Sequence, residues 1–385
     1  MNIDTLFNDF LSDIRLTENQ RKDLKKGHTT LRERLEADPT LSKILISTFL
    51  QGSYKRATAI RPAGGKRADV DVIAVTNLDR ETVTPDDAIT DFIPFMEKHY
   101  KGKYRVQGRS IGIELSYVDL DVVITSAPSE IEEEKIYKSA SVRSELSLDD
   151  FTRSYPWKLS AVWNDADLIK GNTTLNEAIR KAPEWKTEPL WIPDRDAQCW
   201  TQTDPLEQIR WTQDKNQKTS GHYVNVVKAV KWMKLEKMAD IKHPKGYPLE
   251  HMLGDYCPDN ITSVGEGVVL SLENFITKTK MYRLLNIVPE FPDRGVPSHN
   301  VWKRISTEEF ATFYDAVKEL AKTARKAYDA PDLADKVKYW RELFGNKFPE
   351  PPKQDRAKSL SGTGGDNGGF SERTAPSIVG GSRFA

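Results

Sequence analysis

The sequence predicts an α+β protein in which a small mixed sheet packs against a mainly helical lobe. Runs rich in β-branched residues, typical of strands, occupy residues 69–76, 103–108 and 111–125. From residue 221 onward, the apolar residues follow a helical period. The length of 385 residues exceeds one small core and favours two packed lobes, with a substrate cleft between them.

Composition and pattern divide the chain into four expected segments. They are N-terminal helices that pack on the core (1–40), a catalytic lobe with the sheet (41–160), a mainly helical lobe with a cleft loop (161–350), and a C-terminal tail (351–385). We expect the tail to be flexible because residues 354–385 hold seven glycines and five serines and few apolar side chains.

The elements before and between the strands are expected to be helical. Residues 3–37 look helical, and Thr17 followed by Gln20 is a capping-box signature. Residues 42–51 end a helix or enter a first strand, and residues 84–100 suit another helix.

The segment 150–220 differs because it is rich in Trp, Pro and Asp and shows no clean period. Its run 191–211 is expected to be a loop that stacks on or hydrogen-bonds a nucleobase, with Asp194 and Gln198 as candidate contacts. An inter-lobe packing segment is the alternative reading of any single residue there.

Helices are expected through the rest of the chain, near 221–238, 249–256, 263–278, 306–329 and 332–345. Ser306 and Glu309 form a second capping box.

A Gly-Ser pair, Gly52–Ser53, precedes the first acidic strand and is followed by the basic residues Lys55 and Arg56. Glycine lets the backbone approach a ligand closely, and a hydroxyl with neighbouring N–H groups can hold phosphate oxygens. The pair alone is a weak signal. With a D-x-D strand close downstream, it predicts a phosphate-binding turn.

Two aspartates, Asp69 and Asp71, stand one residue apart at the start of that strand. Residues at this spacing point to the same face of a strand. Adjacent carboxylates repel each other and resist desolvation, but a divalent cation between them makes the arrangement favourable, and Mg²⁺ prefers oxygen ligands. A solvated strand face is the alternative.

A third carboxylate comes from the run 113–124, where Asp119 and Asp121 repeat the same spacing. Two-metal phosphoryl transfer needs carboxylates from at least two elements to hold ions about 4 Å apart. We predict Asp121 as the third ligand because it directly precedes an apolar segment, and Asp119 is the second candidate. The predicted cofactor is Mg²⁺, as two ions held by Asp69, Asp71 and Asp121.

The ordered motifs GSYKRATAIRP, ADVDVIAV and DLDVVIT resemble the nucleotidyltransferases of the polymerase-β type, and more narrowly the bacterial cGAS/DncV-like nucleotidyltransferases of clade D. The resemblance covers about residues 40–345. It implies a polymerase-β-type lobe and a template-independent enzyme that uses ATP and GTP to make a 3′-5′ linked cyclic oligonucleotide. The implied product is a cyclic trinucleotide such as cyclic AMP-AMP-GMP, a signal in antiviral (CBASS) defence.

The resemblance also implies roles for individual residues. Asp69, Asp71 and Asp121 would be catalytic. The nucleotide would be held by Gln51, Gly52, Ser53, Lys55, Arg56, Asp194, Lys228 and Lys231.

Two later segments carry further parts of the resemblance. Lys231 fits best as the lysine of a basic helix (222–234) that reaches the triphosphate, and a solvated lysine is the alternative. In GYPLEHML (246–253), Gly246 stands where the family often has a serine, which puts that serine's nucleotide contact in doubt.

Composition excludes several classes of protein. Lys plus Arg and Asp plus Glu both number 57, so a nucleic-acid coat protein is not indicated and no obligatory nucleic acid is expected. Cys199 and Cys257 indicate neither a zinc ribbon nor a disulfide framework. Because no long apolar run or signal-like N-terminus occurs, we expect no membrane contact and a cytoplasmic protein, and we also predict a monomer.

The tail ends in Gly380, Gly381, Ser382, Arg383, Phe384 and Ala385. The family resemblance implies a partner enzyme of the ubiquitin-transfer type (E1/E2) that joins the carboxylate of Ala385 to a target. An inert linker end is the alternative.

Two other functions stay open from the sequence. The chain could tail RNA or adenylylate a protein or small molecule, or it could be a catalytically inactive nucleotide-binding module. The zero net charge argues against RNA as substrate. Retention of Ser53 with three clustered acids argues against an inactive copy.

Overall fold

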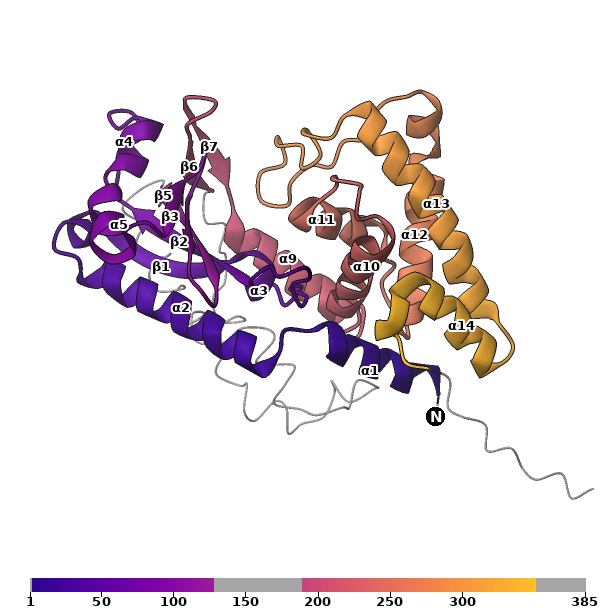
Figure 1. Cartoon of the computed structure of the whole chain (residues 1–385). Coiled ribbons are helices and arrows are strands. Elements are labelled where there is room, and N and C mark those ends of the chain that lie inside the picture. The colour runs from indigo at the N-terminus through magenta and orange to yellow at the C-terminus, as the bar shows by residue number, and fades with distance from the viewer. Residues whose placement is uncertain (1, 128–188, 351–385) are drawn as a thin grey trace, which may run out of the picture. The chain divides into compact units, whose positions relative to one another are not determined.

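The computed structural model describes residues 2–127 and 189–350, and in this part of the chain one seven-stranded mixed sheet carries the first lobe (Figure 1). The strand order is β1-β2-β5-β4-β3, and β6 joins β5 to β7. Strands β2 and β5 pair in parallel and the other neighbours are antiparallel. The strands are β1 (Leu45–Gln51), β2 (Asp69–Thr76), β3 (Tyr104–Val106), β4 (Ile111–Glu114), β5 (Asp119–Ser126), β6 (Leu190–Asp194) and β7 (Cys199–Thr203).

Five helical segments belong to the N-terminal part of the chain or accompany the first strands. They are α1 (Ile3–Ile14), α2 (Glu18–Ala37), α3 (Gly52–Lys55), α4 (Pro85–Thr90) and α5 (Ile93–Tyr100), with a short 3₁₀ turn at Leu41–Lys43. The later helices build the second lobe. They are α9 (Pro205–Lys218), α10 (Tyr223–Lys237), α11 (Gly246–Tyr256), α12 (Val264–Leu284), α13 (Thr307–Asp329) and α14 (Leu333–Phe344), with a closing 3₁₀ turn at Gly345–Lys347.

Alternate residues of β2 and β5 form the core of the sheet lobe. Val70 and Val72 of β2 lie in one buried cluster with Leu120 and Val122 of β5 and with the leucines of α2. Because side chains alternate along a strand, the residues between them point to the opposite face. The acidic residues of both strands therefore share the face that α2 does not cover.

That opposite face has a smaller apolar core further along the strands. Ile73 and Val75 of β2 pack there with Phe49 of β1, Leu190 of β6 and Leu206 of α9. The apolar residues fill the far end of this face, and the acidic residues lie at the other end, where β2 and β5 begin.

The helical lobe has its own core, and α1 belongs to it. Phe7 and Phe10 of α1 pack among Trp340, Phe344 and Phe348, and Phe10 stacks on Phe344 at 4.4 Å between ring centroids. Helix α2 covers the sheet instead. The two N-terminal helices, expected together as one segment (1–40), thus serve two different cores.

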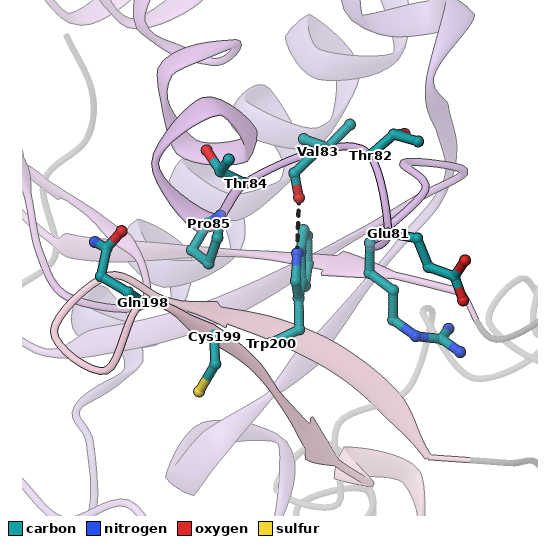
Figure 2. Close-up of a pocket in the computed structure, with 9 residues that line it drawn as sticks. Glu81, Thr82, Val83, Thr84, Pro85, Gln198, Cys199 and Trp200 are labelled. Atoms are coloured by element: carbon teal, nitrogen blue, oxygen red, sulfur yellow. Dashed lines mark hydrogen bonds between the residues drawn. The ribbon is translucent and has the colours of Figure 1, made fainter.

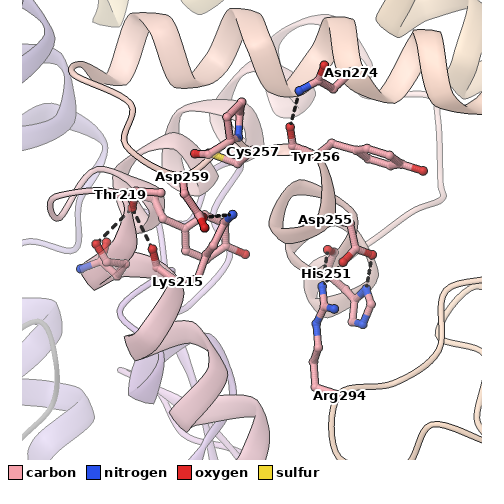
Figure 3. Close-up of polar contacts among 12 residues, drawn as sticks. Lys215, Thr219, His251, Asp255, Tyr256, Cys257, Asp259, Asn274 and Arg294 are labelled. Carbon is pink, nitrogen blue, oxygen red and sulfur yellow. Dashed lines mark hydrogen bonds and ion pairs between the residues drawn. The ribbon is translucent and has the colours of Figure 1, made fainter.

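Polar contacts tie the helices of the second lobe together (Figure 3). Lys215 Nζ of α9 pairs with Asp259 Oδ1 at 2.6 Å, and Asn274 of α12 donates to the carbonyl of Tyr256 at 2.9 Å. Arg294 pairs with Asp255 of α11. These contacts fix α11 between the neighbouring helices and the loop that carries Arg294.

Both capping boxes are confirmed. Thr17 Oγ1 accepts from the backbone N–H of Gln20, whose side chain in turn accepts from the N–H of Thr17. Ser306 and Glu309 make the same reciprocal pair at the start of α13. The α+β class is confirmed as well.

Two predicted elements are each divided in the structure. Residues 84–100 form two helices because Pro94 has no N–H to bond the preceding turn, so it stands in the first turn of α5 rather than inside one long helix. The run 111–125 forms β4 and β5, joined by a turn in which the Leu115 N–H donates to the Val118 carbonyl. The region expected to be helical over 3–37 consists of α1 and α2, and α2 begins after the predicted cap at Thr17.

The prediction of a loop at 191–211 was wrong. This segment forms the β6–β7 hairpin and the first turns of α9, so strands assigned to the helical lobe (161–350) belong to the sheet. Pro193 lies within β6, opposite Trp200 of β7, and outside the single β5–β6 pair, which joins Ser126 to Trp191.

Some predictions fall outside the described residues. The flexible tail (351–385), with conjugation at Ala385, lies there, as do the parts of both lobes in 128–188. In the described part, none of the helices is both long and apolar enough to span a bilayer. The cytoplasmic location and the monomeric state stay predictions.

Candidate active site

The four acidic residues of the sheet lobe lie in two opposed pairs. In the parallel β2–β5 register, Asp69 is opposite Asp119 and Asp71 is opposite Asp121. Neighbouring strands lie about 4.8 Å apart, and residues in register point to the same face. The structure therefore brings together the three acids predicted to be catalytic, with Asp119 beside them.

Helix α3 places the Gly-Ser turn against these acids. Gly52 follows β1 with a positive φ of 76°, a conformation that favours glycine. A Cβ at this position would lie 2.7 Å from Cγ of Asp71 and would overlap its Oδ2. The turn can take this path only because residue 52 has no side chain.

Electrostatic crowding is strongest at Asp71. Burial raises the pKa of Asp71 to about 7, with further rises from Asp69 and Asp121 and a partial offset from Arg56. Burial, and then Asp69, also raise the pKa of Asp121. Asp69 lies at the more exposed start of β2, where desolvation of its carboxyl raises its pKa and Lys231 opposes the rise. A cation near these groups would relieve this cost.

The two candidates for the third carboxylate have different neighbours. Asp119 is paired with Arg67, whose Nε lies 2.6 Å from Oδ1. Asp121 has no cationic partner of this kind in the part of the chain that the structure describes, and its Oδ1 accepts from Gln107 Nε2 at 2.9 Å. Asp119 is therefore already neutralised, and Asp121 keeps the more available negative charge.

The donor set suits a hard cation, but the carboxylates do not converge on one point. Among residues 2–127 and 189–350, no group of three or more His, Cys, Asp or Glu side chains is arranged to hold a metal ion. Asp71 faces Gly52 and Asp121 faces Gln107. A shared site would need these side chains to turn toward one another, and carboxylate oxygens are the ligands that Mg²⁺ prefers.

The backbone after α3 closes tightly on the Gly-Ser turn. The Ser53 carbonyl accepts from the N–H groups of Thr58 and Ala59, at 2.9 and 3.1 Å. Lys55 and Arg56, expected at the phosphates, are both buried. Gln51, the last residue of β1, is opposite Asp71 in the β1–β2 register and is only partly buried.

Residues of the helical lobe reach this turn. Lys231 Nζ of α10 donates to the Thr58 carbonyl at 3.0 Å and to Glu250 Oε1 of α11 at 2.6 Å. Arg56 Nε donates to Glu250 Oε2 at 3.0 Å. The alternative reading of Lys231 as a solvated lysine is wrong. Lys228, one turn earlier on α10, is buried.

Asp194 ends β6, Gln198 lies in the β6–β7 turn, and both have structural partners. Asp194 pairs with Arg109 and accepts from the N–H groups of Asp196 and Ala197, both at 3.1 Å. Gln198 Nε2 donates to Asp86 Oδ2 at 2.8 Å. These bonds explain both residues without a nucleotide, so their contact with a base stays a prediction.

A pocket of about 430 Å³ lies between the loop 80–85 and the β6–β7 turn (Figure 2). Trp200 stands in it, and its indole N–H donates to the Val83 carbonyl at 2.9 Å. None of the predicted catalytic residues lines this pocket, so it belongs to a different part of the sheet lobe.

Sequence reasoning missed Gln107 and Glu250 as members of the site. Gln107 follows β3 and meets Asp121 only through the β3–β4–β5 pairing, which no local pattern shows. Glu250 stands in the segment GYPLEHML, where the family resemblance concerns position 246 and implies no role for this carboxylate.

Comparison with known proteins places this chain in a family. The SMODS family, described as the Second Messenger Oligonucleotide or Dinucleotide Synthetase domain, matches residues 1–129. The cyclic AMP-AMP-GMP synthase of Enterobacter hormaechei subsp. hoffmannii is 44% identical over 384 residues, which cover 98% of this chain and 97% of that protein. A relative from Salmonella paratyphi B is also 44% identical, over 385 residues, with the same coverage.

Solved structures share the fold at low sequence identity. The CdnG nucleotidyltransferase of Bradyrhizobium diazoefficiens in complex with GTP aligns with a TM-score of 0.62 at 11% identity, over 90% of this chain and 95% of that one. Escherichia coli MS115-1 CdnC with ATP aligns with a TM-score of 0.59 at 15% identity, over 90% and 98%. On the strength of the near full-length relatives, this chain belongs to the cGAS/DncV-like nucleotidyltransferases and is an enzyme of the cyclic oligonucleotide synthase type.

Proposed function

We propose that this chain joins ATP and GTP into cyclic AMP-AMP-GMP, with its reaction centre at Asp69, Asp71 and Asp121. The product assignment is supported by the 44% identity to the E. hormaechei synthase, which spans nearly the whole of both chains. The observation that carries the site is the parallel register that places Asp71 opposite Asp121, beside the Gly52 turn.

Two Mg²⁺ ions are the proposed cofactors, held by Asp69, Asp71 and Asp121. When bound, Mg²⁺ would neutralise phosphate charge and lower the pKa of the attacking hydroxyl. The crowded, partly desolvated carboxylates support this assignment because their charge is compensated only weakly within the described chain.

The remaining residues are proposed to bind and orient the nucleotide. The Gly52–Ser53 turn would hold triphosphate oxygens through backbone N–H groups and the Ser53 hydroxyl. Lys231, fixed beside this turn, would add a cation at the triphosphate. We assign Gln51, Lys55, Arg56 and Lys228 to the same binding region, and Asp194 to base contact, on the family resemblance.

The reaction test uses the purified protein with ATP, GTP and Mg²⁺. We expect pyrophosphate release and a phosphatase-resistant product with the mass of cyclic AMP-AMP-GMP. The double change Asp69→Asn and Asp71→Asn should abolish turnover at little cost in side-chain volume. A matched control, Asp332→Asn with Asp335→Asn, removes the same charge from the start of α14 and should keep activity.

The alternatives give different results in the same assay. An enzyme that tails RNA or adenylylates another acceptor would release pyrophosphate only when that acceptor is added. An inactive module would bind nucleotide and release none. Linear products alone would argue against the proposed cyclisation.

We further propose that the product acts as a signal in antiviral defence, as the family resemblance implies. Host cells that carry the chain with its natural neighbouring genes should resist phage. The Asp69→Asn and Asp71→Asn double variant should lose that resistance. If the wild type and the double variant protected the cells equally, the resistance would not depend on the catalytic activity of this chain.

A further inference from the structure

Glu250 is the buried meeting point of two cations from different parts of the fold. Its residue is only 3% exposed. Its Oε2 accepts from Arg56 of the sheet lobe at 3.0 Å and its Oε1 accepts from Lys231 of α10 at 2.6 Å. One carboxylate of α11 therefore joins the residue after α3 to the neighbouring helix α10.

A buried carboxylate is costly unless its oxygens are satisfied. Burial alone would raise the pKa of Glu250, but the charges and hydrogen bonds of Arg56 and Lys231 outweigh burial and lower that pKa to about 2. Arg56 is also held from its other side, with its guanidinium 5.0 Å from the centre of the Tyr247 ring. Glu250 thus remains ionised and keeps both cations in fixed positions.

The contacts of Lys231 link Glu250 to the Gly-Ser turn. The ammonium also donates to the Thr58 carbonyl at 3.0 Å, and the Thr58 N–H donates to the Ser53 carbonyl at 2.9 Å. An ammonium has three N–H donors. Two acceptors among the described residues fix the direction of two of them, and the third is then held in one orientation beside the turn.

We infer that Glu250 is a positioning residue for nucleotidyl transfer, holding Lys231 beside the Gly52–Ser53 turn so that its ammonium meets the triphosphate of the bound nucleotide. This inference rests on the proposed function, in which the turn and Lys231 bind that triphosphate. Glu250 acts through Lys231 and does not itself touch the nucleotide, because both of its oxygens are occupied by cations.

A double-mutant cycle on nucleotide affinity tests this role. The probe is the Mg²⁺ complex of an ATP analogue with a methylene group in place of the α,β-bridging oxygen, with Kd measured by calorimetry. We expect Glu250→Gln and Lys231→Met each to raise Kd about tenfold, the loss of one charge-assisted contact. In the Lys231→Met background, Glu250→Gln should change Kd less than twofold, because the residue through which it acts is gone.

A merely structural ion pair would behave differently. If Glu250→Gln raised Kd by the same factor with and without Lys231, its effect would be general and the inference would be overturned. Tighter binding by Glu250→Gln would overturn it too, because Glu250 would then compete with the phosphates for Lys231. Glu273→Gln, which breaks the ion pair with Arg325 within the helical lobe, is the control and should leave Kd unchanged.

Loss of the carboxylate leaves Arg56 and Lys231 without their buried counter-charge, so Glu250→Gln could fail to fold. Glu250→Asp keeps the charge on a side chain one methylene shorter, which cannot span both cations. We expect this variant to fold and to raise Kd severalfold, again only when Lys231 is present. Wild-type affinity in Glu250→Asp would contradict the inference.

Failure of the proposed function would look different from failure of this inference. If the wild-type chain binds the analogue but makes no cyclic product, the proposed product is wrong while the affinity cycle remains valid. If the product forms and the cycle shows no coupling, only the role of Glu250 is wrong.

Discussion

Gly52 and Asp71 lie in such close contact that no side chain fits between them. A Cβ at residue 52 would stand 2.7 Å from Cγ of Asp71 and overlap its carboxylate oxygen. The positive φ of Gly52 directs the chain into this contact. The turn proposed to bind phosphate and a proposed metal ligand thus lie in direct contact, so a side chain added at residue 52 would displace the acid.

We predict that Gly52→Ala abolishes turnover because the added methyl displaces the Asp71 carboxylate. Gly64→Ala is the matched control, since Gly64 has a similar φ of 65° but open space around its missing Cβ. Both changes should cost about 1–2 kcal/mol of backbone strain, measured by urea denaturation. Only Gly52→Ala should lose pyrophosphate release. Equal activities in the two variants would show that the contact has no catalytic importance.

Gln107 is predicted to orient Asp121 for the metal. Gln107→Leu keeps the side-chain size but removes the amide that donates to Asp121 Oδ1 at 2.9 Å. Loss of such a supporting bond typically costs 10–100-fold in metal affinity or activity. We expect a higher Mg²⁺ concentration for half-maximal rate, with thermal stability little changed.

The control for this change is Asn274→Leu, which removes an amide bond to the Tyr256 carbonyl within the helical lobe. Its Mg²⁺ dependence should match that of the wild type. An unchanged Mg²⁺ response in Gln107→Leu would mean that Asp121 needs no such support.

The acidic centre was predictable from the sequence because its signals are local. Asp69 and Asp71 stand at strand spacing before an apolar β-branched run, and Asp121 repeats that pattern. The acidic face of each strand can therefore be predicted from the residues of that strand alone. The capping boxes are local in the same way. The parallel pairing that sets Asp71 opposite Asp121 needed the family resemblance or the structure.

The parts that could not be predicted depend on contacts between distant residues. Gln107 reaches Asp121 across β4, and Glu250 meets Arg56 across 194 positions of sequence. The β6–β7 hairpin was missed because residues 191–211 show no clean period, and β6 joins β5 through a single pair, Ser126 with Trp191. Such partners have no sequence period and are set by tertiary packing.

Divalent cations are predicted to stabilise the wild-type fold. Repulsion among the carboxylates at Asp69, Asp71 and Asp121 opposes folding when no cation is bound, and a ligand that binds only the folded state adds stability by mass action. At Mg²⁺ well above its Kd, we expect a gain of about 1–3 kcal/mol relative to EDTA.

The Asp69→Asn and Asp71→Asn double variant should lose this gain and be more stable than the wild type in EDTA. Thermal unfolding in the two buffers measures both effects. An equal response to Mg²⁺ in wild type and variant would place the cation somewhere else.

The ionised side chain of Asp204 lowers the stability of the folded protein. It caps α9 by accepting from the Glu207 N–H at 2.8 Å, and the chain at Gly295 lies close against it. Burial raises the pKa of Asp204 to about 6, with contributions from Glu207 and Asp293. When the pKa of a carboxyl is higher in the folded protein than in the unfolded chain, its ionisation destabilises the fold. The protein therefore loses stability as the pH rises from the unfolded pKa to the folded pKa.

We therefore predict that Asp204→Asn, which retains an oxygen for the cap, stabilises the protein at pH 8 by about 1–2 kcal/mol. This gain is smaller than the free energy equivalent to the whole pKa shift of Asp204, because solvent screens the partly exposed side chain. The gain should shrink toward zero as pH falls to 4.5, where the folded protein already holds the proton. Urea denaturation at both pH values measures this gain in stability.

Asp332→Asn, at the N-cap of α14, is the exposed control and should show little change at either pH. A gain from Asp204→Asn that is equal at pH 8 and pH 4.5 would show that its charge carries no cost in the folded state.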